Sequence, residues 1–187
     1  MLSNKLNQLL INTIEFVTRG IKAINTDHAN IHKGLGRITS DYLELSGNGT
    51  QEYCIETGEN SYIHFKNLTL MVLGSSASVE ILENPTVTSN TGNELFVSNP
   101  NSVSSSVSSA IIRKNPTYTG GTLIDRVYSL ADATNQSVGI SSIATDSNEE
   151  LVLKTDSQYI IKFEEVKGEP VEVFWRAFFY EEEEGLA

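Results

Sequence analysis

The sequence is poor in cysteine, in basic residues and in long apolar runs, and each shortage excludes a class of protein. A single cysteine, Cys54, excludes an internal disulfide framework and a cluster of thiolate zinc ligands. Thirteen lysines and arginines stand against 24 acids, for a formal net charge of -11. That balance argues against nucleic acid as a partner, because phosphates must be met by positive charge. No apolar run approaches the roughly 20 residues of a membrane-spanning helix, so we expect no membrane partner either.

What the sequence does have is enough apolar material for a core, since 39% of its 187 residues are hydrophobic. Charge is divided unevenly. Residues 1–40 carry five bases and two acids, whereas residues 41–187 carry eight bases and 22 acids. A mildly basic anchor that docks on an acidic partner would explain this division, and chance variation over 40 residues is the alternative. We predict an N-terminal helix and linker (1–33), a β-domain (34–180) and an acidic tail (181–187).

Apolar residues in the first segment recur at helical spacings of four, four, three, four and three. They are Leu6, Leu10, Ile14, Val17, Ile21 and Ile24. The spacing predicts an amphipathic α-helix with one apolar stripe. β-branched residues at both seam positions favour a homotrimer over a homodimer if the helix self-associates. The alternative is a helix that packs against its own domain.

After Ile31 the helical period gives way to short runs separated by Gly, Asn, Ser and Pro. We predict ten strands, at 37–45, 52–57, 62–74, 78–83, 94–97, 107–114, 122–130, 151–154, 158–164 and 171–180. No strand–helix alternation is visible, which argues against a parallel α/β enzyme fold. The fold class expected is all-β: an antiparallel β-sandwich, jelly-roll-like, preceded by the N-terminal α-helix.

The last predicted strand, 171–180, is apolar on both faces over part of its length. One face is apolar throughout, and the other turns from polar to aromatic with Phe174, Phe178 and Tyr180. Such a strand is either central to the core or pressed against a neighbouring subunit. The glutamates at 181–184 are expected to end the strand and remain solvated.

A weak internal repeat follows the pattern Asn-Pro-Thr-apolar-Thr, a glycine turn, and then a leucine that opens the next strand. Its copies are Asn84–Thr88 and Asn115–Thr119. Two such units in one domain predict a pseudo-symmetric sheet, because a solenoid needs more copies. A Ser/Asn-rich loop at 98–109 lies between them.

The residues offer little for catalysis or metal binding. His28 and His32 are four apart, but residue 29 is Ala where a metalloprotease helix has glutamate, and a third ligand is missing. Neither Gly-rich serine segment, 74–78 or 139–143, has the Gly-x-Ser-x-Gly pattern of a nucleophile elbow. We expect no catalytic residues, no metal and no cofactor, and we expect that the protein is not an enzyme.

Several segments together resemble a group of tailed-bacteriophage virion proteins. The main ones are 80–88 (Glu-Ile-Leu-Glu-Asn-Pro-Thr-Val-Thr), 115–123 (Asn-Pro-Thr-Tyr-Thr-Gly-Gly-Thr-Leu), 153–162 and 174–180, with 27–34 and 61–68 upstream. The resemblance spans residues 26 to 180. It implies a structural protein of the particle with a capsid-decoration or head-auxiliary role, and it supplies no catalytic residues.

The sequence therefore predicts a structural virion protein on the outer surface of the capsid. Its partners would be copies of itself, the major capsid protein or other virion proteins, through repeated contacts. The residues expected at the assembly interface are Leu10, Ile14, Val17, Ile21, Ile24, Phe174, Phe178 and Tyr180. Alternatives are a tail or neck adaptor, and a glycan-binding module that uses residues 98–109 with Tyr118.

Overall fold

The computed structural model describes residues 31–101, 103–131, 138–143 and 151–183. Within these ranges the chain forms twelve strands, and residues 31 and 32 are helical. The predicted helix stripe, Leu10, Ile14, Val17, Ile21 and Ile24, lies outside the described residues.

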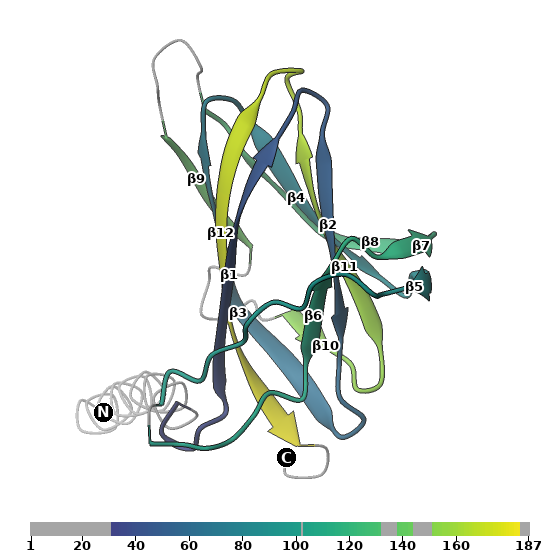
Figure 1. The fold of residues 1–187 in the computed structure, drawn as a ribbon. Coiled ribbons are helices and arrows are strands. Elements are labelled where there is room, and N and C mark those ends of the chain that lie inside the picture. The colour runs from purple at the N-terminus through teal and green to yellow at the C-terminus, as the bar shows by residue number, and fades with distance from the viewer. Residues whose placement is uncertain (1–30, 102, 132–137, 144–150, 184–187) are drawn as a thin grey trace, which may run out of the picture.

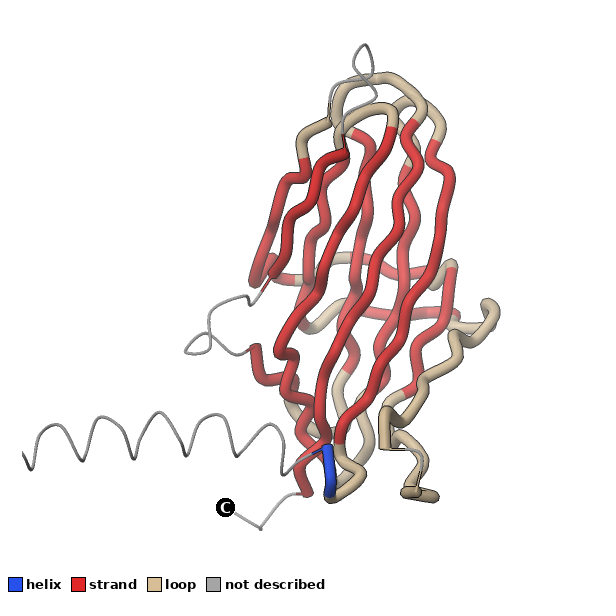
Figure 2. The backbone as a smooth tube through the Cα atoms, turned by 90° about the vertical axis from the view of Figure 1, so that its left-hand side faces the viewer, coloured by secondary structure: helices blue, strands red, loops and turns tan. Residues whose placement is uncertain are grey.

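Two five-stranded antiparallel sheets pack face to face (Figures 1 and 2). Sheet A has the order β1 (Gly36–Leu45), β12 (Val171–Glu183), β3 (Ser61–Leu73), and then both β9 (Val138–Ile143) and β10 (Leu151–Leu153) beside β3. Sheet B has the order β6 (Ile111–Lys114), β2 (Thr50–Glu56), β11 (Gln158–Glu165), β4 (Ala77–Glu83) and β8 (Thr122–Ser129). The all-β, antiparallel sandwich expected from the sequence is confirmed.

The pairing of the strands is nested along the chain. β1 pairs with β12, β2 with β11, β3 with β10, and β4 with β8. Successive members of this series alternate between sheet A and sheet B. The first half of the chain therefore runs antiparallel to the second half, and the resulting double strand is wound across both sheets.

The core lies between the sheets because every second side chain of each strand points inward. Trp175 of β12 contacts Tyr53 of β2 and Phe163 of β11, with ring centroids 5.1 and 5.5 Å apart. These three rings are completely buried and join the two sheets. Each such pair adds roughly 0.5–1.5 kcal/mol beyond the area it buries.

The two copies of the sequence repeat form a third, two-stranded sheet of β5 (Thr86–Ser89) and β7 (Thr117–Thr119). Each copy begins with an asparagine in the left-handed region, Asn84 or Asn115, both with φ 54°. This ribbon lies on the outer side of sheet B (Figure 1). The two copies of the repeat therefore pair with each other, as a pseudo-symmetric arrangement requires.

The segment 94–97 was predicted as a strand, and this prediction is wrong. Residues 93–98 form a strap between the open edges of the two sheets. Ser98 exchanges two backbone hydrogen bonds with Ile38 of β1, while Leu95 N–H donates to Ile112 of β6. The strap pairs with one residue at a time because it crosses from sheet to sheet, and in doing so it covers two edges that would otherwise be free to pair with other chains.

Candidate functional site

The outer surface of sheet A carries a group of apolar side chains, here called the outer apolar patch. Its members are Ile38, Tyr42, Met71, Leu73, Phe174 and Phe178. Tyr42 is 48% exposed and Phe174 is 42% exposed. Scattered apolar side chains are normal on a protein surface, but adjacent exposed ones on one sheet face, such as Tyr42 and Phe174, indicate an interaction surface.

Strand register brings the patch together. Tyr42 of β1 lies opposite Phe174 of β12, and Phe174 lies opposite Met71 of β3. Two rows along the same face, beyond the row that contains Arg176, Ile38 lies opposite Phe178. Side chains directly opposite one another on the same face of an antiparallel sheet have Cβ atoms about 5 Å apart. The patch is therefore one surface that spans three strands.

A positive charge lies within this surface. Arg176 lies between Phe174 and Phe178 on the outer side of β12, opposite Ser40 and Thr69. Arg176, Phe178, Asn67 and Thr69 line a shallow hollow of about 210 Å³. An arginine with aromatic side chains to either side along its strand is a common composition for the energetic centre of a protein–protein contact.

The three residues predicted on β12 have different surroundings. Phe174 and Phe178 lie in the outer apolar patch, whereas Tyr180 is buried at 8% exposure. The Tyr180 ring stacks on His64 at 4.5 Å, and Lys66 Nζ lies 5.2 Å from its centroid. Two of the three side chains are therefore brought together at the surface, and Tyr180 packs within its own chain.

The N-terminal segment enters the described fold next to the patch. A methyl group at Gly36 would lie 3.4 Å from Ile31 Cγ1 and 3.6 Å from Phe178 Cε2. Ile31 and Phe178 thus flank the same glycine. Ile31, the first described residue, therefore lies at the same end of the molecule as Phe178.

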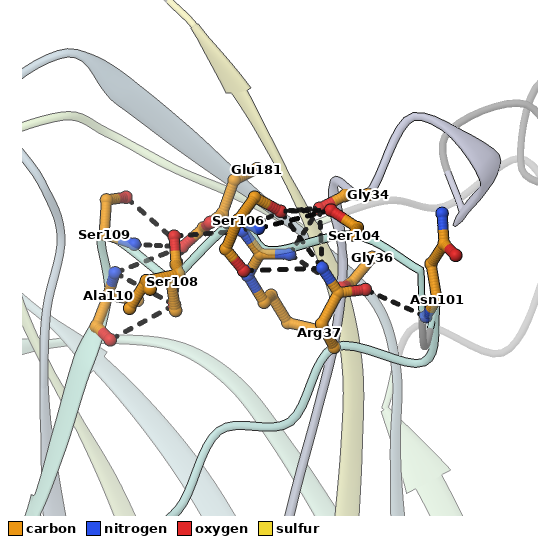
Figure 3. A network of polar contacts seen from close by, with 12 residues as sticks. Gly34, Gly36, Arg37, Asn101, Ser104, Ser106, Ser108, Ser109, Ala110 and Glu181 are labelled. Atoms are coloured by element: carbon orange, nitrogen blue, oxygen red, sulfur yellow. Dashed lines mark hydrogen bonds and ion pairs between the residues drawn. The ribbon is translucent and has the colours of Figure 1, made fainter.

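A buried polar network fixes the same end (Figure 3). Glu181 Oε2 pairs with Arg37 Nη2 at 2.9 Å. Its other oxygen accepts hydrogen bonds from Ser108 Oγ, Ser109 N, Ser109 Oγ and Ala110 N, at 2.7 to 3.2 Å. Arg37 also donates to the carbonyls of Gly34, Gly36 and Val107. The network ties the loop that precedes β6 to the start of β1 and the end of β12.

This network corrects the boundary of the predicted acidic tail. β12 continues to Glu183, three residues into the segment assigned to the tail. Glu181 is 5% exposed because Arg37 neutralises its charge and the loop donors satisfy its oxygens. A glutamate with these partners extends the strand, whereas an unpaired one would have to remain in water.

The loop and the tyrosine suggested for glycan binding are not brought together. The loop at 98–109 is held at the end of β1, where Asn101 Nδ2 donates to His32 O and Ser106 Oγ donates to Gly34 O. Tyr118 lies on the ribbon over sheet B, where burial and the nearby Glu52 carboxylate raise the pKa of its hydroxyl. The loop and Tyr118 therefore have different surroundings in the sandwich.

The described residues offer few reactive groups. Cys54 is completely buried, and burial with the nearby Glu56 raises the pKa of its thiol to about 12, so the thiol is protonated at neutral pH. Glu164 pairs with Lys162 on the outer face of β11, while the adjacent Glu165 is buried at the end of the strand. Among the described residues, His, Cys, Asp and Glu side chains form no group of three that could hold a metal ion.

Sequence reasoning missed Tyr42 and Met71 of the patch, and the pair Arg37–Glu181. Alternation in 37–45 places Tyr42 on the face opposite Leu43, which was the available signal. Which strands lie beside it cannot be predicted from a single sequence, because register is set by tertiary packing.

No described helix is long and apolar enough to cross a membrane.

No family model matches this chain, and no curated protein matches it. Among solved structures it is similar to the crystal structure of the Yersinia pseudotuberculosis-derived mitogen, with 12% sequence identity and a TM-score of 0.31. That similarity covers 80% of this chain and 91% of the mitogen chain. A similarity of this size carries no argument about function.

Proposed function

We propose that this protein is a non-enzymatic structural component of a tailed-phage virion that decorates or reinforces the outer surface of the capsid. The observation that carries the proposal is the outer apolar patch, with Tyr42 and Phe174 adjacent and each more than 40% exposed. Copies of this chain and the capsid protein would bury the patch. The sequence resemblance to phage virion proteins is the reason for assigning the chain to a phage particle.

The chain path supports a finer assignment of the fold as jelly-roll-like, preceded by an N-terminal helix. The nested strand pairs and their alternation between two sheets are what a double strand wound into two Greek keys produces. Viral capsid domains and lectins both use this architecture. Because one fold can serve many functions, the function depends on the surface that the fold presents.

Assembly would be driven by removal of apolar area from water. Completing the burial of a half-exposed aromatic side chain contributes on the order of 1 kcal/mol. Specific contacts usually bury about 800 Å² on each partner. Because a capsid repeats each contact many times, modest affinity in one contact suffices. A homotrimer would match the three-fold positions of a capsid.

Sedimentation velocity of the full chain tests self-assembly. We expect the wild type to form an oligomer, and a Tyr42→Ser/Phe174→Ser double variant to sediment as a monomer, because the centre of the contact has become polar. Leu123→Ser is the matched control, since Leu123 is 46% exposed but lies on sheet B. A wild-type chain that is monomeric at all concentrations, or a double variant that assembles normally, would refute the assembly face.

Deletion of residues 1–25 tests the helix separately. We expect a folded monomer that no longer assembles, with the circular dichroism of a β-protein retained. Loss of folding would show instead that the segment belongs to the core.

Cryo-electron microscopy of the intact particle tests the location. We expect the chain at repeated positions on the capsid shell. Density for it only at the tail or neck would refute the capsid assignment and establish the adaptor alternative.

A further inference from the structure

A second surface lies on the outer side of sheet B, away from the outer apolar patch. It is a hollow of about 360 Å³, within the range of about 300–1,000 Å³ that is usual for small-molecule sites. Three strands and a turn supply its lining, chiefly Ser78 and Glu80 of β4, Arg126 and Tyr128 of β8, Glu164 of β11, and Asn48. These residues do not contribute to the assembly surface.

Strand register determines the composition of the hollow. Ser78 lies between Tyr128 and Glu164 in one cross-strand row, and Glu80 lies opposite Arg126 in the next. Ser78 and the Glu80 side chain are buried, whereas the Tyr128 residue is 50% exposed. The hollow therefore has a polar floor and an aromatic wall open to solvent.

The charged groups in the hollow already have partners. Arg126 pairs with Glu80 and donates a hydrogen bond to the Tyr128 hydroxyl at 3.3 Å. Glu164 accepts a hydrogen bond from Lys162 at 2.9 Å. Carboxylates outnumber the single guanidinium of the lining, so an anionic ligand would be repelled. Carboxylates that are each engaged by a cation also make a poor metal site.

We propose that this hollow binds a neutral saccharide. One face of a pyranose ring is apolar and packs on an aromatic ring, while its hydroxyls both donate and accept hydrogen bonds. Tyr128 supplies the aromatic surface, and Glu80, Arg126 and Ser78 supply acceptors and donors at the floor. A mostly apolar ligand would remove the polar groups of the floor from water without offering them hydrogen bonds in return, which disfavours it. The site is independent of the assembly proposal.

The edge of the hollow is held rigid by Glu165. Its Oε2 accepts hydrogen bonds from the backbone N–H groups of Asn48 and Gly168, at 2.9 and 2.7 Å. Its Oε1 accepts from Lys167 N at 2.6 Å and Ser75 Oγ at 3.1 Å. These bonds fix the turn that carries Asn48 against β11. A preformed site loses little conformational entropy when its ligand binds.

The experiment titrates the full chain with maltotriose, cellotriose, chitotriose and lactose, and with inorganic phosphate as the anionic probe. Calorimetry and ¹H–¹⁵N NMR provide the readouts. We expect at least one neutral oligosaccharide to bind with a Kd of about 1 mM or below and to shift amide signals of β4 and β8. Tyr128→Ala should weaken binding at least about tenfold, and Tyr128→Trp should retain it.

Two control variants isolate the site. Tyr42→Ala removes a tyrosine of nearly equal exposure from sheet A, so it should affect assembly and leave saccharide binding unchanged. Gln158→Ala alters a separate hollow of about 450 Å³ whose described lining has no aromatic residue. The proposal is overturned if none of the four oligosaccharides binds, if phosphate binds more tightly than all of them, or if folded Tyr128→Ala binds like the wild type. Amide shifts confined to β1 and β12 would also overturn it.

Discussion

Arg37 and Glu181 form an ion pair of 2.9 Å in which both side chains are almost entirely shielded from water. Arg37 is the second residue of β1, and Glu181 lies near the end of β12. The pair therefore joins the first and the last strand of the sandwich domain. The carboxylate also holds the loop before β6 through Ser108 and Ser109. One buried charge pair therefore aligns three segments that are distant in sequence.

Removal of one partner should be severely destabilising. In Glu181→Ala the Arg37 guanidinium would remain buried without its counter-charge, and the backbone donors of Ser109 and Ala110 would lose their acceptor. We expect the free energy of unfolding to fall by about 3–5 kcal/mol in urea denaturation. Lys154→Met provides the control. Its salt bridge with Glu83 is solvent-exposed, so the loss should be no more than about 1 kcal/mol.

The Arg37→Met/Glu181→Leu double variant distinguishes the pair from the carboxylate alone. Replacement of both charges avoids an unpaired buried ion, so the double variant should be more stable than Glu181→Ala. If the wild type, Glu181→Ala and the double variant all unfold at the same urea concentration, the ion pair has no structural role.

Glu165 gives the fold a specific sensitivity to acid. Burial alone would raise the pKa of its carboxyl, but hydrogen bonds from the backbone N–H groups of Asn48, Lys167 and Gly168 outweigh burial and lower this pKa to about 2. A carboxyl with a lowered pKa stabilises the folded state above its unfolded pKa of 4.5. That stabilisation is lost as the pH falls from 4.5 toward 2.

The free energy of unfolding of Glu165→Gln should therefore be about 2 kcal/mol lower than that of the wild type at pH 7. This difference should narrow as the pH falls from 4.5 to 2, and urea denaturation across this pH range measures it. Glu164→Gln is the adjacent control, because Glu164 makes a partly exposed pair with Lys162, and its effect should stay below about 1 kcal/mol. A gap between Glu165→Gln and wild type that is constant with pH would contradict the assignment.

Cys54 lies on the face of β2 opposite the core residues Tyr53 and Ile55, which is the side of sheet B that carries the ribbon of β5 and β7. The reactivity of its thiol therefore tests whether the ribbon covers it. The rise in its pKa from 9.0 to about 12 lowers the thiolate fraction at neutral pH by about 1,000-fold, so the native thiol should react far more slowly with a disulfide reagent than the urea-unfolded chain does. Tyr118→Ala removes a large side chain of the ribbon and should accelerate labelling. Thr117→Ala, an exposed neighbour, should not. Equal rates for native and unfolded protein would show that the ribbon does not cover the thiol.

Much of the fold could be predicted from local pattern. Period-two alternation located β1, β3, β4, β11 and β12 to within a residue or two at most ends, because one face of each strand must enter the core. The internal repeat was also visible, and its copies became β5 and β7. These features depend on neighbours in the sequence, which a single chain displays directly.

Features that depend on distant partners could not be predicted. Residues 94–97 alternate like a strand, but the segment 94–98 crosses between the two sheets, and Glu94 pairs with Arg113 of sheet B while Ser98 pairs with Ile38 of sheet A. Glu181 resembles the start of a solvated acidic run until Arg37 is placed beside it. The outer apolar patch likewise depends on register, which sets Tyr42 next to Phe174 and Phe174 next to Met71.

Gly120 and Gly121, which join β7 to β8, allow backbone strain to be separated from steric contact. Both have positive φ, 67° and 109°, a region that other residues adopt at a cost. A Cβ at Gly120 would meet nothing within 4 Å, whereas a Cβ at Gly121 would lie 3.1 Å from Leu82 Cβ. We therefore expect the free energy of unfolding, measured by urea denaturation, to fall by about 1 kcal/mol in Gly120→Ala and by about 2–3 kcal/mol in Gly121→Ala.

Gly121→Ala should also speed labelling of Cys54, which shares a cross-strand row with Leu82 through Ile160. Equal losses of stability for the two variants would show that Leu82 does not restrict the turn, and unchanged labelling would show that the turn does not hold the ribbon in place.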